Sequence, residues 1–415
     1  MQFPPVAAKI ISFILAAIMP FLSTVFGKIG KYTEIPGSSY TAMEKAGGFM
    51  AGICHSDPEY QKIKDANIGW VRVDLPFPFD ANGELSWSYI YTKNELREYV
   101  ENGLKVMAVT PNPRVYLEHG IDIRNDEDIP KIQEIALFYL NDYKGIVSAF
   151  QIANEMGIDR FTEPFTLEEG AKFIGVQLEV MYPLRGDILI GYNLAGTAIA
   201  SLPSLMKEYH KYTDYIGADL YFGTFENIFN SIESYPAMLN MLHAVTRKPL
   251  IVAEFGYIGC GAPKTEEEKA EMLEKYGVHS EEEAKQDIDA FVSNLPKDLR
   301  EDFERLYSDK SDEEKWSLLF EGEFANHIYR ELPEDIVLTG YPHTPEGQAK
   351  FFEDLIPVFK NLDYCLGAFI YSWKDADRCY VCGQTDCPVE TGWGLLDREG
   401  NEKPAYYAVQ KAFAS

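Results

Sequence analysis

The chain has 415 residues, of which 46% are hydrophobic and 25% are charged, which is the composition of a soluble globular enzyme. Its net charge of −27 repels phosphate backbones and anionic lipids, so we expect no nucleic-acid partner.

The first 28 residues form a hydrophobic segment. No residue from Ile10 to Gly27 is charged, and a single lysine, Lys9, precedes this run. Eighteen neutral residues reach the lower limit for crossing a bilayer. The run therefore predicts a signal peptide or an uncleaved membrane anchor, and hence export or membrane attachment. Two other interpretations remain. The segment could be an amphipathic helix on a membrane surface, or, in a cytoplasmic protein, a helix packed under the following domain.

Residues 29–43 are predicted to be a polar linker, because they contain the breaker cluster Pro36–Ser39.

Residues 44–415 alternate between short apolar runs typical of buried strands and stretches with the i, i+3, i+4 apolar spacing of helices. Eight such strands with helices between them predict a single α/β domain, a closed (β/α)8 TIM barrel. The predicted strands are Gly48–Cys54, Gly69–Asp74, Leu104–Thr110, Val147–Glu155, Asp187–Tyr192, Tyr215–Tyr221, Pro249–Gly256 and Leu366–Trp373. The predicted helices are Tyr60–Ala66, Asn94–Gly103, Pro130–Tyr143, one starting near Thr166, Ile228–Val245 and Pro404–Ala412.

The connection between the seventh and eighth strands, residues 260–343, is too long for a loop and should carry its own structure. It is rich in Glu, Asp and Lys at helical spacing, so we predict a helical insertion. This insertion is either a lid or wall beside the barrel mouth, or a charged, solvated subdomain without a role in the chemistry.

Two of the predicted strands end in a carboxylate. The fourth ends in Asn154-Glu155, and the seventh contains Glu254. Because the carboxyl ends of all strands in a (β/α)8 barrel meet at one face, both carboxylates are expected at the same rim. Arg72 in the second strand and Trp373 at the end of the eighth are expected there as well.

With these residues at these strands, the chain resembles the retaining glycoside hydrolases of clan A, a large group of (β/α)8 barrels that includes the family 5 cellulases and mannanases. The phrase from Glu390 to Tyr407 also looks like the C-terminal end of many such barrels. The resemblance covers residues 48–413. The chain departs from the family 5 pattern in two places: Met156 stands where Pro usually follows the glutamate, and Thr110-Pro111-Asn112 stands where a His is common.

The resemblance implies that Glu155 is the acid/base and Glu254 the nucleophile of a double displacement on a β-linked carbohydrate, without a cofactor for the reaction. Two carboxylates so close together cannot both be comfortably ionised, so we expect Glu155 to keep its proton. The resemblance also implies a hydrogen bond from Tyr221 to the nucleophile and a contact between Asn154 and the sugar 2-hydroxyl.

The remaining candidates have more than one interpretation. Arg72 would keep Glu254 ionised, or would form an ordinary salt bridge of the barrel. Trp373 would stack under the sugar, but it and Tyr221 could also be core aromatics. His55, at the end of the first strand, is either a sugar contact or a structural histidine.

Four of the six cysteines follow the seventh and eighth strands and could meet on the rim: Cys260, Cys379, Cys382 and Cys387. Four thiolates could hold a structural zinc ion. In an exported protein the same residues could form two disulfides, and free thiols are the third possibility.

Three other functions remain open from the sequence. The same residues could catalyse transglycosylation. The chain could be a membrane-tethered carbohydrate-binding protein with a degenerate site, which the intact pair Glu155 and Glu254 disfavours. A barrel that uses these two glutamates as metal ligands is a weaker alternative.

Overall fold

The computed structural model describes residues 38–415, except 197, 226–228, 262, 323 and 333. The hydrophobic segment 1–28 and residues 29–37 of the predicted linker lie outside the described residues. From residue 38 onward the predicted linker is helical, because α2 spans Ser38–Ala46. Among the helices of the described part, none is both long and apolar enough to cross a bilayer.

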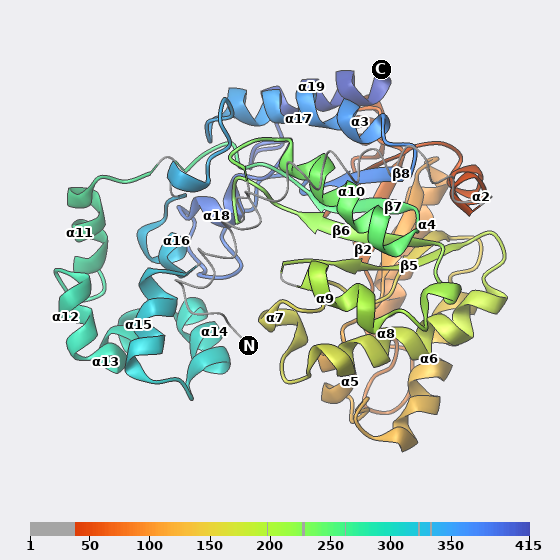
Figure 1. The fold of residues 1–415 in the computed structure, drawn as a ribbon, viewed down its shortest axis with the longest axis horizontal. Helices are drawn as coiled ribbons and strands as arrows, with labels where there is room; N and C mark the ends of the chain where they lie inside the picture. The colour runs from red at the N-terminus through yellow and green to blue at the C-terminus, as the bar shows by residue number, and fades with distance from the viewer. Residues whose placement is uncertain (1–37, 197, 226–228, 262, 323, 333) are drawn as a thin grey trace.

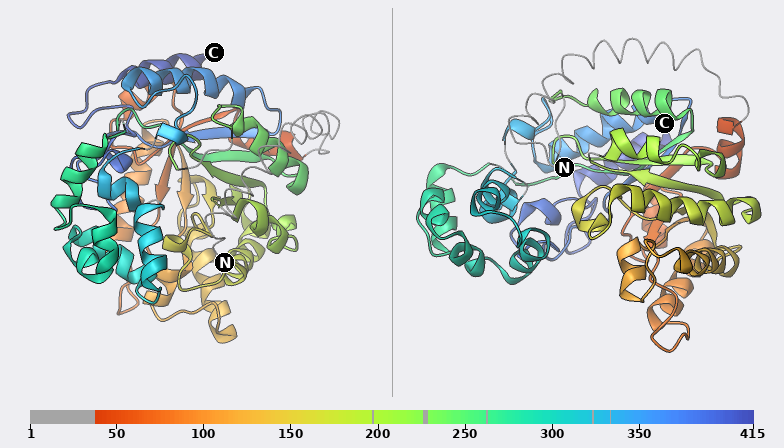
Figure 2. Two further views of the ribbon diagram at one scale, coloured as in Figure 1. Left: turned by 60° about the vertical axis from the view of Figure 1, so that its left-hand side comes forward. Right: turned by 60° about the horizontal axis from the view of Figure 1, so that its bottom comes forward.

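The predicted barrel is confirmed. Eight parallel strands close into a barrel in chain order, each paired with its neighbours and β1 paired with β8 (Figures 1 and 2). The strands are β1 (Met50–Cys54), β2 (Trp70–Asp74), β3 (Lys105–Val109), β4 (Val147–Gln151), β5 (Leu189–Leu194), β6 (Tyr215–Leu220), β7 (Leu250–Phe255) and β8 (Cys365–Ile370).

Helices follow the strands and cover the outside of the barrel. They are α3 (Tyr60–Asp65), α4 (Trp87–Glu101), α6 (Ile129–Asp142), α8 (Leu167–Met181), α9 (Ala198–Leu205), α10 (Ser234–Thr246), α17 (Pro345–Lys360) and α19 (Pro404–Ala414). Helix α8 starts with the expected capping box, in which Thr166 and Glu169 satisfy each other's backbone amides. Helix α4 begins earlier than predicted because the Ser86 side chain caps it. Helices α17 and α19 lie side by side (Figure 1).

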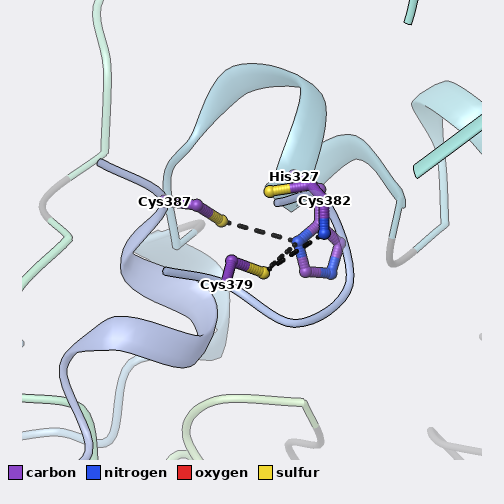
Figure 3. Close-up of side chains that lie close together, drawn as sticks. All are labelled: His327, Cys379, Cys382 and Cys387. Atoms are coloured by element: carbon purple, nitrogen blue, oxygen red, sulfur yellow. Dashed lines mark hydrogen bonds between the residues drawn. The ribbon is translucent and has the colours of Figure 1, made fainter. Parts of the chain in front are cut away.

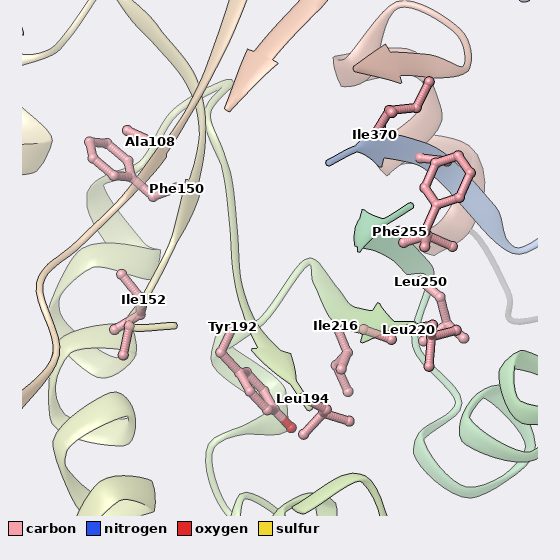
Figure 4. Packing of buried hydrophobic residues seen from close by; sticks show 14 of the residues in the cluster. Ala108, Phe150, Ile152, Tyr192, Leu194, Ile216, Leu220, Leu250, Phe255 and Ile370 are labelled. Carbon is pink, nitrogen blue, oxygen red and sulfur yellow. The ribbon is translucent and has the colours of Figure 1, made fainter. Parts of the chain in front are cut away.

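Alternate residues of each strand face two different cores. The outward residues, among them Phe150, Tyr192 and Ile216, pack against the helices in one large cluster (Figure 4). The inward residues fill the barrel near the start of the strands, and Ala42 and Ala46 of α2 join that inner cluster. The interior near the start of the strands is therefore a packed core, which leaves the carboxyl ends of the strands for polar groups.

The predicted insertion between β7 and β8 is helical. It contains α11 (Glu266–Glu274), α12 (Glu281–Gln286), α13 (Ile288–Asn294), α14 (Lys297–Tyr307), α15 (Asp312–Phe320) and α16 (Phe324–Tyr329). These helices form a lobe beside the barrel (Figures 1 and 2). The lobe has its own hydrophobic cluster, which continues into the segment after β8 through Val389 and Trp393 and reaches Tyr221 after β6. The insertion is thus packed against the barrel near Tyr221, and a role as a lid or wall beside the mouth stays a prediction.

Candidate active site

Three carboxylates meet at the carboxyl end of the barrel. Glu155 follows β4, Asp219 lies in β6 and Glu254 lies in β7, and one oxygen of each lies within 4.8 Å of the others. All three side chains are buried. The predicted meeting of Glu155 and Glu254 at one rim is therefore observed.

Glu155 reaches this position through an unusual backbone path. Strand β4 ends at Gln151, earlier than predicted, and both Ala153 (φ 59°) and Glu155 (φ 48°) adopt the left-handed conformation. Residues with a Cβ seldom adopt this conformation, and it persists where surrounding contacts enforce it. Here the amide of Ala153 donates to Thr110 Oγ1 at 3.1 Å and that of Glu155 donates to Asn193 Oδ1 at 3.0 Å.

Glu254 points into the mouth because of a β-bulge. Ile251 and Ala253 belong to the inner cluster, so strict alternation would turn Glu254 outward. The pairing of β6 with β7 skips one residue at this place: Val252 pairs with Ala218, and Glu254 pairs with Asp219. A bulge that re-aims one side chain next to an active site is a recurrent device.

Arg72 holds Glu254 and Asn154 together. Its Nη1 donates to Glu254 Oε1 at 2.5 Å, its Nη2 to Asn154 Oδ1 at 2.6 Å and its Nε to Gln151 Oε1 at 3.2 Å. Burial by itself would lower the pKa of Arg72, but the charges of Glu254 and of the other acidic groups around it, taken together, raise that pKa well above its usual value. The guanidinium is therefore a permanent positive charge beside the Glu254 carboxylate.

The second oxygen of Glu254 accepts a hydrogen bond from the Tyr221 hydroxyl. Burial and then the charge of Glu254 raise the pKa of Tyr221 well above its usual value, so this phenol remains a donor. Glu254 thus receives one hydrogen-bond donor on each of its two carboxylate oxygens.

Asp219 is the most buried of the three carboxylates, at 1% exposure. It accepts a hydrogen bond from Asn193 Nδ2 at 2.5 Å through Oδ2. Burial, followed by the charges of Glu254 and Glu155, raises the pKa of Asp219 well above its usual value. Asp219 therefore holds its proton to a higher pH than an exposed aspartate does.

The interpretation that Trp373 stacks under a sugar at the barrel mouth is wrong, and the alternative, a core aromatic, agrees with the structure. Strand β8 ends at Ile370, and the Trp373 side chain is fully buried in the outer cluster, where Nε1 donates to Glu59 Oε2 at 2.8 Å. Its indole therefore has no face at the barrel mouth. The aromatic residue that follows β8 and reaches the mouth is Tyr371, whose ring lies 6.1 Å from that of Tyr221 between centroids.

His55 lies at the end of β1 as predicted, and its side chain is exposed. Its ring meets the Tyr371 ring edge to face at 5.2 Å. It thus lies beside the aromatic residues of the mouth, where a sugar contact remains a prediction.

Sequence reasoning missed four residues of the mouth. Gln151, Asn193 and Asp219 are polar residues inside otherwise apolar strands, and that pattern was a usable signal because buried polar groups need partners. Tyr371 gave no comparable signal, since the nearby Trp373 fitted the same pattern.

A cleft of about 280 Å³ lies at the ends of β2, β3 and β4. Asp74, Phe77, Asn112, Arg114, Asn154 and Arg160 are among its lining residues. Asn154, which directly precedes Glu155 in the chain, connects this cleft with the group of carboxylates.

The insertion and the segment after β8 stand next to this cleft. Arg160 forms an ion pair with Asp302 of α14 at 2.6 Å, and its guanidinium lies over the Tyr380 ring at 5.6 Å. Glu390 is buried and accepts from the Tyr371 hydroxyl at 3.5 Å. Burial, followed by the charge of Cys379, raises the pKa of Glu390 to about 8. A second group of polar side chains thus connects the insertion to the mouth.

The prediction that Cys260 joins the other three cysteines is wrong. Cys260 is exposed, whereas Cys379, Cys382 and Cys387 are buried and meet His327 of α16 instead. All six cysteines of the chain lie in the described part, and none of them forms a disulfide there. No sequence pattern pointed to His327, because it lies 52 residues before the first of these cysteines along the chain.

The sequence matches no protein-family model and no curated protein. Solved structures, in contrast, are similar over most of this chain. A GH53 catalytic domain from Ignisphaera aggregans has a TM-score of 0.52 at 15% identity, covering 88% of this chain and 96% of that one. A glucosidase from Croceicoccus marinus has a TM-score of 0.53 at 10% identity, covering 88% and 67%.

An FMN-binding β-glucuronidase from Facaelibacterium prausnitzii has a TM-score of 0.50 at 14% identity, covering 86% of this chain. The chain spans only 40% of that enzyme's length. At these identities the likeness shows the fold, a (β/α)8 barrel similar to glycosidase catalytic domains.

Proposed function

We propose that this protein is a retaining β-glycoside hydrolase of the clan A type, with Glu254 as the nucleophile and Glu155 as the acid/base. The observation that carries the proposal is that one carboxylate oxygen of Glu155 lies within 4.8 Å of one carboxylate oxygen of Glu254 at the barrel mouth. Retaining enzymes have carboxyl groups about 5–5.5 Å apart, whereas inverting enzymes need about 6.5–9.5 Å to admit a water molecule. The short separation therefore favours double displacement.

In the first step, Glu254 attacks the anomeric carbon while Glu155 gives its proton to the departing oxygen. The glycosyl-enzyme ester forms as the glycosidic bond breaks. In the second step, Glu155 takes a proton from water, and the resulting hydroxyl releases the sugar from Glu254. Arg72 and Tyr221 orient the Glu254 carboxylate for attack and stabilise it when it leaves.

Asn154 is suited to bind the sugar. Its Oδ1 already accepts from Arg72, Gln151 and Asn193, at 2.6, 3.0 and 2.9 Å. These three bonds fix the amide plane and leave the Nδ2 group as its donor. We assign to Nδ2 the contact with the sugar 2-hydroxyl, a bond that strengthens in the transition state.

The competing function, a divalent metal held by the three carboxylates, is disfavoured by Arg72. Its guanidinium already occupies the positive position beside Glu254, at 2.5 Å from Oε1. A metal ion bound there would lie next to a buried positive charge with no water to screen it. Activity that survives extensive dialysis against a chelator of divalent ions, at a temperature where the fold is intact, would agree with the glycosidase.

The experiment that tests the proposal is mechanism-based labelling. The protein is incubated with a panel of 2-deoxy-2-fluoro glycosides that carry activated leaving groups and differ in sugar configuration. The fluorine slows both steps, so a glycosyl-enzyme accumulates and adds the mass of one sugar. We expect peptide mapping to place that sugar on Glu254, and Glu254→Gln to abolish the label.

Two further variants sharpen this experiment. Glu155→Gln should still be labelled by substrates with good leaving groups, because those need no protonation, and should turn the adduct over slowly. Glu331→Gln, which changes a buried glutamate of the insertion, is the matched control and should be labelled like the wild type. Sugar binding without any adduct, across all configurations, would favour the carbohydrate-binding protein and contradict our proposal. Adducts released faster by added sugars than by water would identify a transglycosylase.

A further inference from the structure

We propose that this protein binds one Zn²⁺ ion through His327, Cys379, Cys382 and Cys387, and that the ion joins the helical insertion to the segment after β8. His327 lies in α16 of the insertion, and the three cysteines lie between β8 and α18 (Pro388–Thr391). Figure 3 shows the four side chains pointing toward one another from these two parts of the chain. All four side chains are buried, and their ligand atoms lie within 4.8 Å of one another.

The spacing of these atoms fits a tetrahedral zinc ion. Zn–S bonds of about 2.3 Å and Zn–N bonds of about 2.0–2.1 Å, at the tetrahedral angle, place a sulfur and a nitrogen ligand about 3.5–3.6 Å apart. His327 Nδ1 lies 3.6 Å from Cys379 Sγ and 3.5 Å from Cys387 Sγ. Both separations agree with the value expected for ligands of one ion.

The local backbone also suits metal binding. The amide of Cys382 donates to Cys379 Sγ at 3.5 Å, and the amide of Gly383 donates to the Cys379 carbonyl at 2.8 Å. An amide that points at a sulfur stabilises the thiolate and orients it toward an ion. Arg330 also binds the loop between Cys382 and Cys387, because it donates to Asp386 Oδ1 at 2.6 Å and to Gln384 Oε1 at 3.0 Å.

The ligand set indicates both the metal and its role. Three soft thiolates and one imidazole select zinc over the hard ions magnesium and calcium. Four protein ligands leave no position open for water or substrate, which is typical of structural zinc sites. Binding converts three thiols into zinc thiolates and releases their three protons to the solvent, so the bound site carries one net negative charge. Cys260 is exposed outside this group and is not needed.

The position of the site gives the ion a further task. Tyr380 lies between two of the ligands, and Glu390 follows the third ligand after one helical turn. Tyr380 contacts Arg160 beside the cleft, and Glu390 contacts Tyr371 in the mouth. A zinc ion here would fix the positions of Tyr380 and Glu390 beside the cleft and the barrel mouth. This second role rests on the proposed function, whereas the binding of the ion does not.

The test measures metal directly. The full chain is produced in medium with added zinc, purified without chelator, and its metal content is determined by plasma mass spectrometry. We expect about one zinc per chain in the wild type and in Cys260→Ser, the matched control. We expect at least a tenfold loss in His327→Ala and Cys387→Ser.

Cobalt gives a second measurement that needs no variant. Wild-type protein stripped of metal and titrated with Co²⁺ should show the strong visible bands and thiolate charge-transfer band of a tetrahedral thiolate site, saturating at one equivalent.

A fourth variant separates the loss of a ligand from the loss of the fold. His327→Cys should keep the metal, because a fourth thiolate completes the same geometry.

Folded wild-type protein with less than a tenth of an equivalent of zinc and no cobalt spectrum would overturn the proposal. So would a disulfide among the three cysteines in freshly purified protein. Because none of these measurements uses a sugar, a failed labelling of Glu254 and a failed zinc assay are separate results. Zinc removal should lower the thermal midpoint, since the ion binds only the folded chain.

Discussion

The most informative single change is Asp219→Asn, which replaces a buried carboxyl group by a neutral amide of nearly the same shape. Asp219 is 1% exposed, its Oδ1 has no hydrogen-bond partner among the described residues, and Glu155 and Glu254 lie within 4.8 Å. Ionising the Asp219 carboxyl group places one more negative charge in a buried site that already contains the carboxyl groups of Glu155 and Glu254. We therefore expect the variant to be more stable than the wild type at neutral pH.

The pH dependence follows from the sign of the shift. The pKa of Asp219 is raised in the folded protein, so the folded chain binds this proton more tightly than the unfolded chain does. Its stabilising effect is complete below the unfolded pKa of about 3.9 and is lost as the pH rises toward the folded pKa. Between these two values, the wild type loses about 1.4 kcal/mol of unfolding free energy per pH unit relative to the variant.

The size of the effect on melting can be worked out from the chain length. At about 2.1 cal/mol/K per residue, 415 residues give an unfolding entropy of about 0.9 kcal/mol/K. The midpoint difference between Asp219→Asn and the wild type should therefore grow by about 1.6 °C per pH unit from pH 4 up to the folded pKa of Asp219. Differential scanning fluorimetry in a series of buffers from pH 4 to pH 8, at constant ionic strength, measures it.

A matched control is Asp214→Asn. Asp214 directly precedes β6 and accepts a hydrogen bond from Arg185 at 2.8 Å, so this change removes an ion pair and should lower the midpoint at neutral pH. If Asp219→Asn is less stable than the wild type at pH 7, or if its midpoint difference is constant from pH 4 to pH 8, the account of this site is refuted.

Three further changes separate the roles of neighbouring residues. Tyr221→Phe removes one charge-assisted hydrogen bond to Glu254, worth about 1.5–3 kcal/mol, so kcat/KM on an aryl glycoside should fall about 10- to 150-fold with the melting midpoint nearly unchanged. Arg72→Met leaves the Glu254 charge buried without its partner and should lower the unfolding free energy by about 3–5 kcal/mol in urea titrations; a loss below 1 kcal/mol would show that the ion pair is not essential. Trp373→Phe should lower the melting midpoint, because it removes packing and the hydrogen bond to Glu59. Its KM should stay within about twofold of the wild type, because this residue lies outside the mouth. A large rise in KM would contradict that placement.

The fold could be predicted because its signal is local and repeated. Each buried parallel strand is a short apolar run, each covering helix shows 3.6-residue periodicity, and only a few topologies accommodate eight such pairs. Asn154-Glu155 and Glu254 were found for the same reason, since a carboxylate at the end of an apolar run is visible in the sequence.

The helical insertion was predicted from its charge and spacing, but its attachment was not. Its hydrophobic cluster extends to Trp393 and Tyr221, two residues far away along the chain, and this continuity attaches the insertion to the barrel. Amphipathic spacing shows that a helix has an apolar face but does not show what covers that face.

The sequence by itself determined the barrel, the order of its strands and the pair of glutamates at one rim. Only the tertiary structure decided which side chains face inward at the ends of the strands. The bulge at β7 turned Glu254 into the mouth, and the end of β8 at Ile370 sent Trp373 into the outer core. It also chose His327 over Cys260, because ligands for one ion must meet in space while their separation along the chain is free. Apolar periodicity is read within one element, whereas a bulge, a strand end or a set of ligands depends on neighbouring elements that no local pattern specifies.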